Sequence, residues 1–324
     1  MKFTKKLIVS GIILAATASS TTSYAEQVIR LGHTGAANHH FQAISEQYAE
    51  LVSERTDGEI SIEVYPSDQL GNQTQLVEGT LLGTNDMVLT SDAVLSNFVP
   101  DVGIINLPFI FRDSDHVRTA LDGEVGQDLS TMVEEQGAVV VGWWENGFRH
   151  ITNSRNPIET PEDIEGMKLR VPEGPVFVST FEALGANPTP ISFGELYSAL
   201  QLGVVDGQEN PPAHILTQKF YEVQDYVSRT GHIYLSSPVL INKNLLESLS
   251  EEHQNVILET GRELAAVHTS MVLEEEDQQW EEIAGYGMEI NDVDPAPFIE
   301  ATASVIEQYR GKYNADIIDK ITNM

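Results

Sequence analysis

An alternation of strand, helix and strand patterns near the start of the chain restricts the possible folds more than any other feature. Residues 28–33 form a run typical of a strand, and apolar side chains recur at helical spacing over residues 41–52. Residues 57–58 (Asp-Gly) end this helix, and apolar side chains alternate over residues 60–64 as in a second strand. A strand–helix–strand unit of this kind joins parallel strands by a right-handed crossover. The sequence therefore predicts an α/β fold.

The loops that follow the strands are the expected place for a ligand. In open parallel sheets, ligands bind beyond the carboxyl ends of the strands. His33 and Thr34 follow the first strand, residues 66–71 follow the second, and Thr90 and Ser91 follow the third. We therefore expect these three loops to face one crevice.

A second lobe is expected after the apolar strand at residues 139–144. Thr160 is a typical N-cap, Pro161 suits the first helical position, and the two acidic residues that follow complement the helix dipole. A strand pattern over residues 167–171 comes next, and the proline after it blocks further pairing. Arg170 therefore stands near the carboxyl end of a strand, where its guanidinium can reach the crevice.

The pattern after Ser250 predicts an unusually long helix. Apolar side chains lie on one stripe from Val256 to Val272, and the pattern extends to Ile283. A helix of about 30 residues spans roughly 45 Å, which is longer than one small lobe. The acidic run at residues 274–277 is interpreted as a solvated face of this helix.

The N-terminal residues 1–25 have the features of a secretory signal peptide. Lysines precede an apolar stretch at residues 7–16, and residues 23–25 (S-Y-A) resemble an A-x-A cleavage site. A membrane anchor is the alternative, but spanning needs roughly 20 apolar residues, more than this segment contains. We expect cleavage before Glu26, export to the periplasm and no membrane insertion of the mature protein.

The chain is strongly acidic and has no cysteine. Its net charge of −31 reflects 18 Lys and Arg against 49 Asp and Glu. Nucleic acid and anionic membrane surfaces are excluded as partners, because both need basic patches. A salty habitat is one hypothesis for this composition, and ordinary solubility is the rival one. Without cysteine, the chain can form neither disulfides nor thiolate metal sites.

Motifs for catalysis are absent from the sequence. It has no G-x-S-x-G, H-E-x-x-H, P-loop or G-x-G-x-x-G pattern, so we expect no catalytic residue and no cofactor. His33, His39 and His40 form a loose group with no carboxylate at ligand spacing, so we expect no metal site.

Four motifs in the middle of the chain carry a resemblance to a known family. They are R-H-I-T-N from residue 149, M-K-L-R-V-P from 167, G-A-N-P-T-P-I-S-F-G-E-L-Y-S-A-L-Q from 185 and V-V-D-G-Q-E-N-P-P from 204. The chain resembles the solute-binding proteins of tripartite ATP-independent periplasmic (TRAP) transporters, the DctP family. The resemblance implies the type II periplasmic solute-binding fold, with two lobes, two mixed or parallel sheets flanked by helices, and a long helix that bridges the lobes.

The resemblance also implies how the chain divides into lobes. Lobe I comprises residues 26–148 and 237–275, and lobe II comprises residues 149–236 and 276–324. Two lobes fit the length, because single cores stop growing at about 250 to 300 residues.

In the resembled family, the arginine that matches Arg170 forms a salt bridge with the ligand's carboxylate. Arg149 matches a second arginine at the acid end of the ligand, Asn210 matches an amide that donates to the carboxylate, and Phe193 matches an aromatic that packs on the ligand. A planar guanidinium suits a carboxylate because it offers two parallel donors. From the residues alone, a structural salt bridge for Arg170 and plain core packing for Phe193 stay open.

The far end of the ligand is expected to contact lobe I. At positions where sialic-acid binders carry polar and charged groups, this chain has Thr34, Gln73, Ser91 and Val94, which does not favour sialic acid. We include His33 among the candidate binding residues. Neutral hydrogen-bonding groups suit hydroxyls, so a hexuronate or an aldonate fits best, and residues 143–146 (W-W-E-N) could add an aromatic and polar groups nearby.

The sequence thus predicts a carrier that delivers a small carboxylate solute to the membrane subunits of a TRAP transporter. A C4-dicarboxylate or a 2-oxo or 2-hydroxy acid is an alternative solute. A secreted enzyme for acidic sugars, with Asp206 or Glu209 as acid and base, is an alternative of another class. A sensory module that presents its ligand to a receptor is a third.

Overall fold

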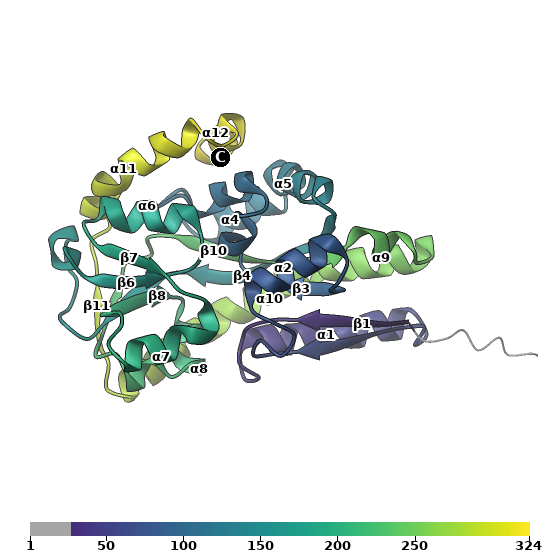
Figure 1. Ribbon diagram of the computed structural model, residues 1–324, viewed down its shortest axis with the longest axis horizontal. Coiled ribbons are helices and arrows are strands. Elements are labelled where there is room, and N and C mark those ends of the chain that lie inside the picture. Colours follow the sequence, from purple (N-terminus) through teal and green to yellow (C-terminus); the bar gives the residue numbers. More distant parts are fainter. Residues whose placement is uncertain (1–26) are drawn as a thin grey trace, which may run out of the picture.

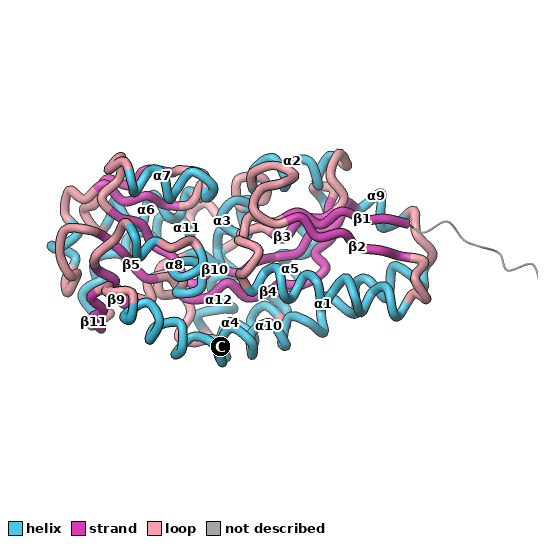
Figure 2. The backbone as a smooth tube through the Cα atoms, turned by 90° about the horizontal axis from the view of Figure 1, so that it is seen from below, coloured by secondary structure: helices cyan, strands magenta, loops and turns pink. Residues whose placement is uncertain are grey.

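The computed structural model describes residues 27–324, and two β-sheets organise it into two lobes (Figures 1 and 2). The predicted signal peptide and cleavage site lie outside the described residues. The first sheet has the strand order β2-β1-β3-β10-β4. Its strands are β1 (Gln27–Gly32), β2 (Ile60–Tyr65), β3 (Met87–Leu89), β4 (Ala138–Phe148) and β10 (Tyr234–Asn242). The first three are parallel to one another, whereas β10 runs antiparallel to both β3 and β4.

The second sheet has the strand order β11-β9-β5-β8-β6-β7 and is also mixed. Its strands are β5 (His150–Asn153), β6 (Lys168–Val171), β7 (Asn187–Pro190), β8 (Gly207–Asn210), β9 (Tyr226–Arg229) and β11 (Glu289–Asp292). β6 is parallel to β7 and β8, whereas β5 is antiparallel to β8 and β9. The predicted α/β fold with two mixed sheets is therefore confirmed.

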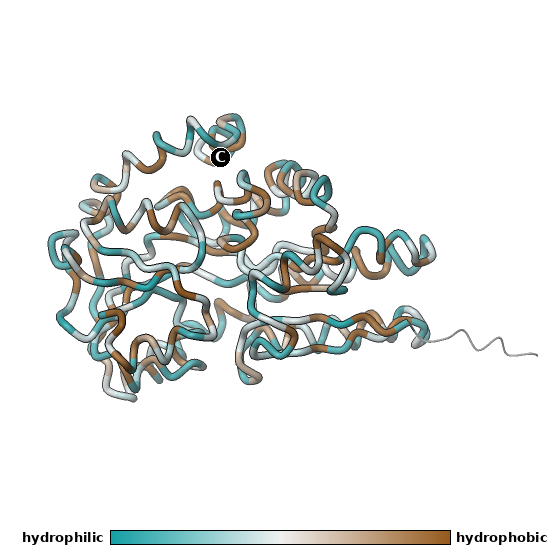
Figure 3. The backbone as a smooth tube through the Cα atoms, in the orientation of Figure 1, coloured by the Kyte–Doolittle hydropathy of each residue, from teal (hydrophilic) through white to brown (hydrophobic). Residues whose placement is uncertain are grey.

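Helices flank both sheets. Along these helices, hydrophobic and hydrophilic residues alternate (Figure 3), as expected for helices that bury one face. The α-helices are α1 (His40–Arg55), α2 (Gln73–Leu82), α3 (Asp92–Leu95), α4 (Ser114–Leu121), α5 (Glu124–Glu135), α6 (Pro175–Ala183), α7 (Leu196–Gln201), α8 (Pro212–Thr217), α9 (Lys243–Glu247), α10 (Glu251–Gly285), α11 (Ala296–Arg310) and α12 (Ala315–Thr322). The 3-10 helices are η1 (Pro100–Asn106), η2 (Pro161–Ile164), η3 (Phe193–Glu195) and η4 (Phe220–Glu222).

Local sequence signals account for several of these elements. The opening β1-α1-β2 unit has parallel strands, as predicted, because its apolar residues change from strand to helix spacing and back. Thr160 and Asp163 form a capping box that starts η2, although this element is a 3-10 turn and not an α-helix. β6 then brings Arg170 next to Gln208 of β8.

The chain crosses between the sheets at Arg149. β4 ends at Phe148 in the first sheet, and β5 begins at His150 in the second. The backbone N–H of Arg149 donates to the carbonyl of Ile233, 2.9 Å away, just before β10 returns to the first sheet. Arg149 therefore lies where two adjacent strands connect the lobes.

The predicted long helix is α10, which has 35 residues and bridges the lobes (Figure 1). Its first half packs against α1 and β4, and its last turns place Trp280 and Ile283 in the hydrophobic cluster that includes Val227 of β9. The helix lies very close to β4: Nε1 of Trp144 in β4 donates to the main-chain carbonyl of Gly261 in α10, 2.9 Å away. A Cβ at Gly261 would lie 2.2 Å from Cγ1 of Val141, so only glycine fits this contact.

The C-terminal helices depart from the expected lobe division. Residues 276–324 are expected as a whole in lobe II, and α11 does pack on α6. However, Ile317, Ile318 and Ile321 of α12 belong to the cluster that contains Leu129 of α5, on the side of the first sheet. The tail therefore returns to the first lobe (Figure 1). Within residues 27–324, no helix combines the length and hydrophobicity needed to cross a membrane.

Candidate functional site

A cavity lies between the two lobes, at the carboxyl ends of strands from both sheets. Its volume is about 30 Å³, which leaves room for about two water molecules. A sugar acid is much larger, so side chains or whole lobes must move apart to admit one. The lining consists of Phe41, Gln73, Ser91, Val94, Asn146, Arg149, Arg170, Pro172, Glu173, Phe193, Asn210, His214 and Leu235.

Arg170 is the cavity's unpaired cation. Arg170 is only 3% exposed, and its Nε donates to the main-chain carbonyl of Ile191 at 2.8 Å. Within residues 27–324, neither terminal nitrogen of Arg170 has a hydrogen-bond partner, and no carboxylate forms an ion pair with it. Burial lowers the pKa of Arg170 to about 9. The guanidinium is therefore charged at neutral pH, and both of its terminal nitrogens are left to donate to an anion.

Arg149 is also buried, but it is paired with Glu209 of β8. Nε and Nη2 of Arg149 lie 2.5 and 2.8 Å from the two carboxylate oxygens of Glu209, and Nη2 also donates to the main-chain carbonyl of Glu209 at 2.6 Å. Burial alone would raise the pKa of Glu209, but Arg149 outweighs it and holds that pKa below its ordinary value. Within the described residues, only Nη1 of Arg149 has no partner. Its charge is thus neutralised before any ligand arrives.

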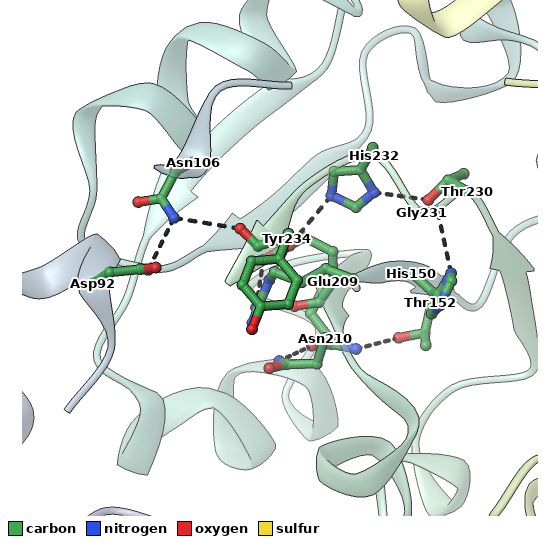
Figure 4. A network of polar contacts seen from close by, with 12 residues as sticks. Asp92, Asn106, His150, Thr152, Glu209, Asn210, Thr230, Gly231, His232 and Tyr234 are labelled. Carbon is green, nitrogen blue, oxygen red and sulfur yellow. Dashed lines mark hydrogen bonds and ion pairs between the residues drawn. The ribbon is translucent and has the colours of Figure 1, made fainter. Parts of the chain in front are cut away.

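A network of polar contacts continues from Glu209 of this ion pair (Figure 4). Nε2 of His232 lies 3.3 Å from Oε2 of Glu209, and the other ring nitrogen lies 2.7 Å from the hydroxyl of Thr230. Gln208, also of β8, donates to Thr152 of the neighbouring strand β5 at 2.9 Å. Because buried polar groups are costly without partners, this network holds β5 and β8 in one arrangement.

Asn210 and Phe193, both predicted site residues, line the cavity beside Arg170. The Asn210 amide donates to the side-chain carbonyl of Gln208, which orients it. The guanidinium carbon of Arg170 lies 5.9 Å from the centre of the Phe193 ring, within the range of a cation–π contact. The structure therefore brings four of the predicted residues of lobe II together: Arg149, Arg170, Asn210 and Phe193.

Three predicted residues of lobe I form a chain of hydrogen bonds. The Ser91 hydroxyl donates to the Gln73 side-chain oxygen at 2.8 Å, and the Gln73 amide donates to the Thr34 hydroxyl at 3.0 Å. Gln73 and Ser91 line the cavity, whereas Thr34 lies behind them, outside the lining. Thr34 is thus placed to orient Gln73.

His33 lies outside the cavity lining and takes part in a different arrangement. Its Nε2 lies 2.9 Å from the side-chain oxygen of Gln42 in α1. The ring is buried, and burial lowers its pKa to about 4. His33 therefore supports α1, including Phe41 of the lining at a ring-centroid distance of 6.2 Å, but does not itself line the cavity.

The histidines near the start of α1 form a compact cluster, not the loose group expected from sequence. Nδ1 of His40 lies 2.6 Å from Nε2 of His268, and the rings of His39 and His214 stack with centroids 4.2 Å apart. Burial lowers the pKa of all four imidazoles, so they are neutral at pH 7. Among residues 27–324, no group of His, Cys, Asp or Glu is arranged to hold a metal ion.

Several lining residues were missed at the sequence level. Glu173 follows β6 and His214 follows β8, so both obey the rule that ligands lie beyond strand ends and could have been found by it. Of the residues 143–146, only Asn146 lines the cavity. Trp143 donates to the Ser130 hydroxyl at 3.0 Å instead, and Thr269 donates to Glu145 at 3.0 Å.

Comparison with known proteins agrees with this geometry. A family model described as bacterial extracellular solute-binding protein, family 7 (DctP) matches residues 31–312. The 2,3-diketo-L-gulonate-binding periplasmic protein YiaO of Escherichia coli (strain K12) is 33% identical over 94% of this chain and 92% of its own length.

Two solved structures superpose closely on the chain. A TRAP periplasmic solute-binding protein from Polaromonas sp. JS666, bound to D-erythronate, has a TM-score of 0.89 at 34% identity, covering 92% of this chain and 98% of that one. Another from Sulfitobacter sp. NAS-14.1, with bound β-D-galacturonate, has a TM-score of 0.89 at 31% identity, covering 92% and 100%.

The fold and the interlobe site define an extracytoplasmic solute-binding protein. The chain belongs to the DctP family and is a solute-binding protein of the TRAP type. Proteins of this family are periplasmic carriers, not enzymes, and they work with membrane permease subunits.

Proposed function

We propose that this protein captures a sugar acid, a hexuronate or an aldonate, in the periplasm and delivers it to the permease subunits of a TRAP transporter. The observation that carries the proposal is the buried guanidinium of Arg170, which is charged and whose two terminal nitrogens have no protein partner among residues 27–324. Such a fork binds a carboxylate in a bidentate manner. Asn210 and Nη1 of Arg149 can add further donors at the same end.

The lobe I side of the cavity supports a hydroxylated ligand. Gln73 and Ser91 present neutral polar groups there, and Asn146 adds an amide. The related proteins bind acids of this kind, namely 2,3-diketo-L-gulonate, D-erythronate and β-D-galacturonate. A C4-dicarboxylate or a 2-oxo or 2-hydroxy acid is the alternative solute.

Lobe closure is the proposed mechanism of capture. Phe41, Gln73 and Ser91 belong to one lobe, whereas Arg170 and Asn210 belong to the other. A ligand favours the closed state only through contacts that the open state lacks. Burying the acid between Arg170 and the polar groups of lobe I supplies such contacts.

The geometry weakens the enzyme hypothesis. Asp206 forms an ion pair with Arg155 at 2.6 Å and accepts from the backbone of Lys168, away from the cavity lining. Glu209 is held as a carboxylate by Arg149. Neither acidic residue is poised to transfer a proton to or from a solute in the cavity.

Titration calorimetry with D-galacturonate, D-galactonate and D-erythronate tests the proposal. Removing Arg170 leaves the ligand's carboxylate buried without its partner, which costs about 3 to 5 kcal/mol. We expect Arg170→Ala to bind its best acid at least about a hundredfold more weakly, because each 1.4 kcal/mol is a factor of ten. Arg262→Ala, which removes an exposed arginine of α10, is the matched control. Near-native affinity in Arg170→Ala would refute the assignment.

A further inference from the structure

Glu173 is a carboxylate in the same cavity as Arg170, at the point where the lobes meet. It follows β6 and Pro172 directly and is partly buried. Both of its contacts come from the first lobe: the Thr74 hydroxyl lies 3.4 Å from Oε2, and the Asn97 amide donates to its main-chain carbonyl. Within residues 27–324, no cation forms an ion pair with the Glu173 carboxylate. Its negative charge acts on nearby Arg170 without forming a salt bridge to it, so a bound solute also meets this charge.

The charges around the cavity leave one cation for a ligand. Arg149 is neutralised by Glu209, and His214 is uncharged because burial lowers its pKa well below the ordinary value. Arg170 remains as the positive group and Glu173 as the negative one. A solute with one carboxylate can pair with Arg170. A second carboxylate would have no cation in the lining and would face the charge of Glu173.

We propose that Glu173 is a specificity-determining residue that restricts the cavity to monocarboxylates, accepting a hydroxyl hydrogen bond and rejecting a second carboxylate. This inference rests on the proposed function, since it concerns the same site. The charge of Glu173 would distinguish aldonates and uronates, which have one carboxylate, from aldarates and C4-dicarboxylates, which have two. Neutral residues such as Gln73 and Ser91 cannot make this distinction by charge.

Matched acid pairs test the inference, because their members differ only at one end. Galactonate ends in a hydroxymethyl group where galactarate has a second carboxylate, and gluconate and glucarate differ in the same way. In calorimetry with the full mature chain, we expect the better aldonate to bind at least about tenfold more tightly than its aldarate, a difference of about 1.4 kcal/mol.

Variants at Glu173 assign this preference to the residue. Glu173→Gln keeps the size and hydrogen-bonding capacity but removes the charge, so the aldonate-to-aldarate ratio should fall about tenfold. Glu173→Lys supplies a second cation and should invert the ratio. The control Glu182→Gln removes an exposed carboxylate of the nearby helix α6 and should leave the ratio unchanged.

The outcomes separate the two proposals. Tight aldarate binding by the wild type, or an unchanged ratio in both Glu173 variants, overturns the inference while the proposed function stands. Failure of the wild type to bind any aldonate or uronate overturns the proposed function and, with it, the inference. An inverted ratio in Glu173→Lys together with a reduced ratio in Glu173→Gln supports both.

Discussion

The ion pair between Arg149 and Glu209 allows a prediction with a definite magnitude. Replacing Glu209 with Gln keeps the shape of the side chain but leaves the charge of Arg149 buried and unpaired, because the two side chains are 3% and 0% exposed. Removing one partner of a buried pair costs about 3 to 5 kcal/mol. At roughly 2 to 4 °C of melting temperature per kcal/mol, the variant should melt about 6 to 20 °C below the wild type.

The same variant should respond more strongly to ligand. In Glu209→Gln, the guanidinium of Arg149 lacks its internal anion, so a carboxylate solute in the cavity becomes its best available partner. A ligand at a hundred times its Kd stabilises any protein that binds it by about 2.7 kcal/mol. At matched galacturonate concentration, we therefore expect a larger rise in melting temperature for Glu209→Gln than for the wild type.

Urea denaturation and thermal melting, each with and without galacturonate, measure both effects. The matched control is Glu263→Gln, which breaks an exposed pair with Arg55 whose side chains are 57% and 36% exposed. Water and salt screen an exposed pair of this kind, so this control should change the stability little. If Glu209→Gln lost no more stability than Glu263→Gln, the argument that Glu209 compensates a buried charge would be wrong.

Two further predictions concern the helix contact and the buried histidines. Gly261→Ala should lower the unfolding free energy by about 1 to 3 kcal/mol, because its Cβ would lie 2.2 Å from Cγ1 of Val141. The control Gly285→Ala places a Cβ in open space on the same helix and should not lower it. An equal loss of stability in both variants would refute the contact argument. The unfolding free energy should also fall as the pH drops from 6.5 toward 4. Over that range the unfolded chain binds protons that His33 and His40, with pKa values lowered to about 4 and about 3, do not take up when folded. A flat urea-denaturation profile between pH 7 and pH 4.5 would contradict this expectation.

Local sequence signals predicted the elements that carry the site. The change from strand to helix spacing placed β1, α1 and β2, and the apolar stripe after Ser250 placed α10, because these patterns depend on neighbours a few residues apart. The same local pattern put Arg170 near the end of β6. The resemblance to the DctP family then predicted that Arg149 and Arg170 bind the ligand.

The partners of these residues depend on contacts between distant parts of the chain. His40 and His268 meet because α10 packs along α1, and the sequence of either segment contains no sign of the other. The α12 helix likewise returns to the first lobe to bury its isoleucines. Such long-range choices follow from three-dimensional packing, which no local pattern encodes.

The sequence by itself determined the α/β class, the long helix and the presence of arginines at strand ends, since hydrophobic periodicity and strand boundaries are local properties. Only the tertiary structure decided which arginine is neutralised. With 49 acidic residues in the chain, any of them could have paired with Arg149 or Arg170. The antiparallel pairing of β5 with β8 brings Glu209 to Arg149, whereas no carboxylate among residues 27–324 forms an ion pair with Arg170.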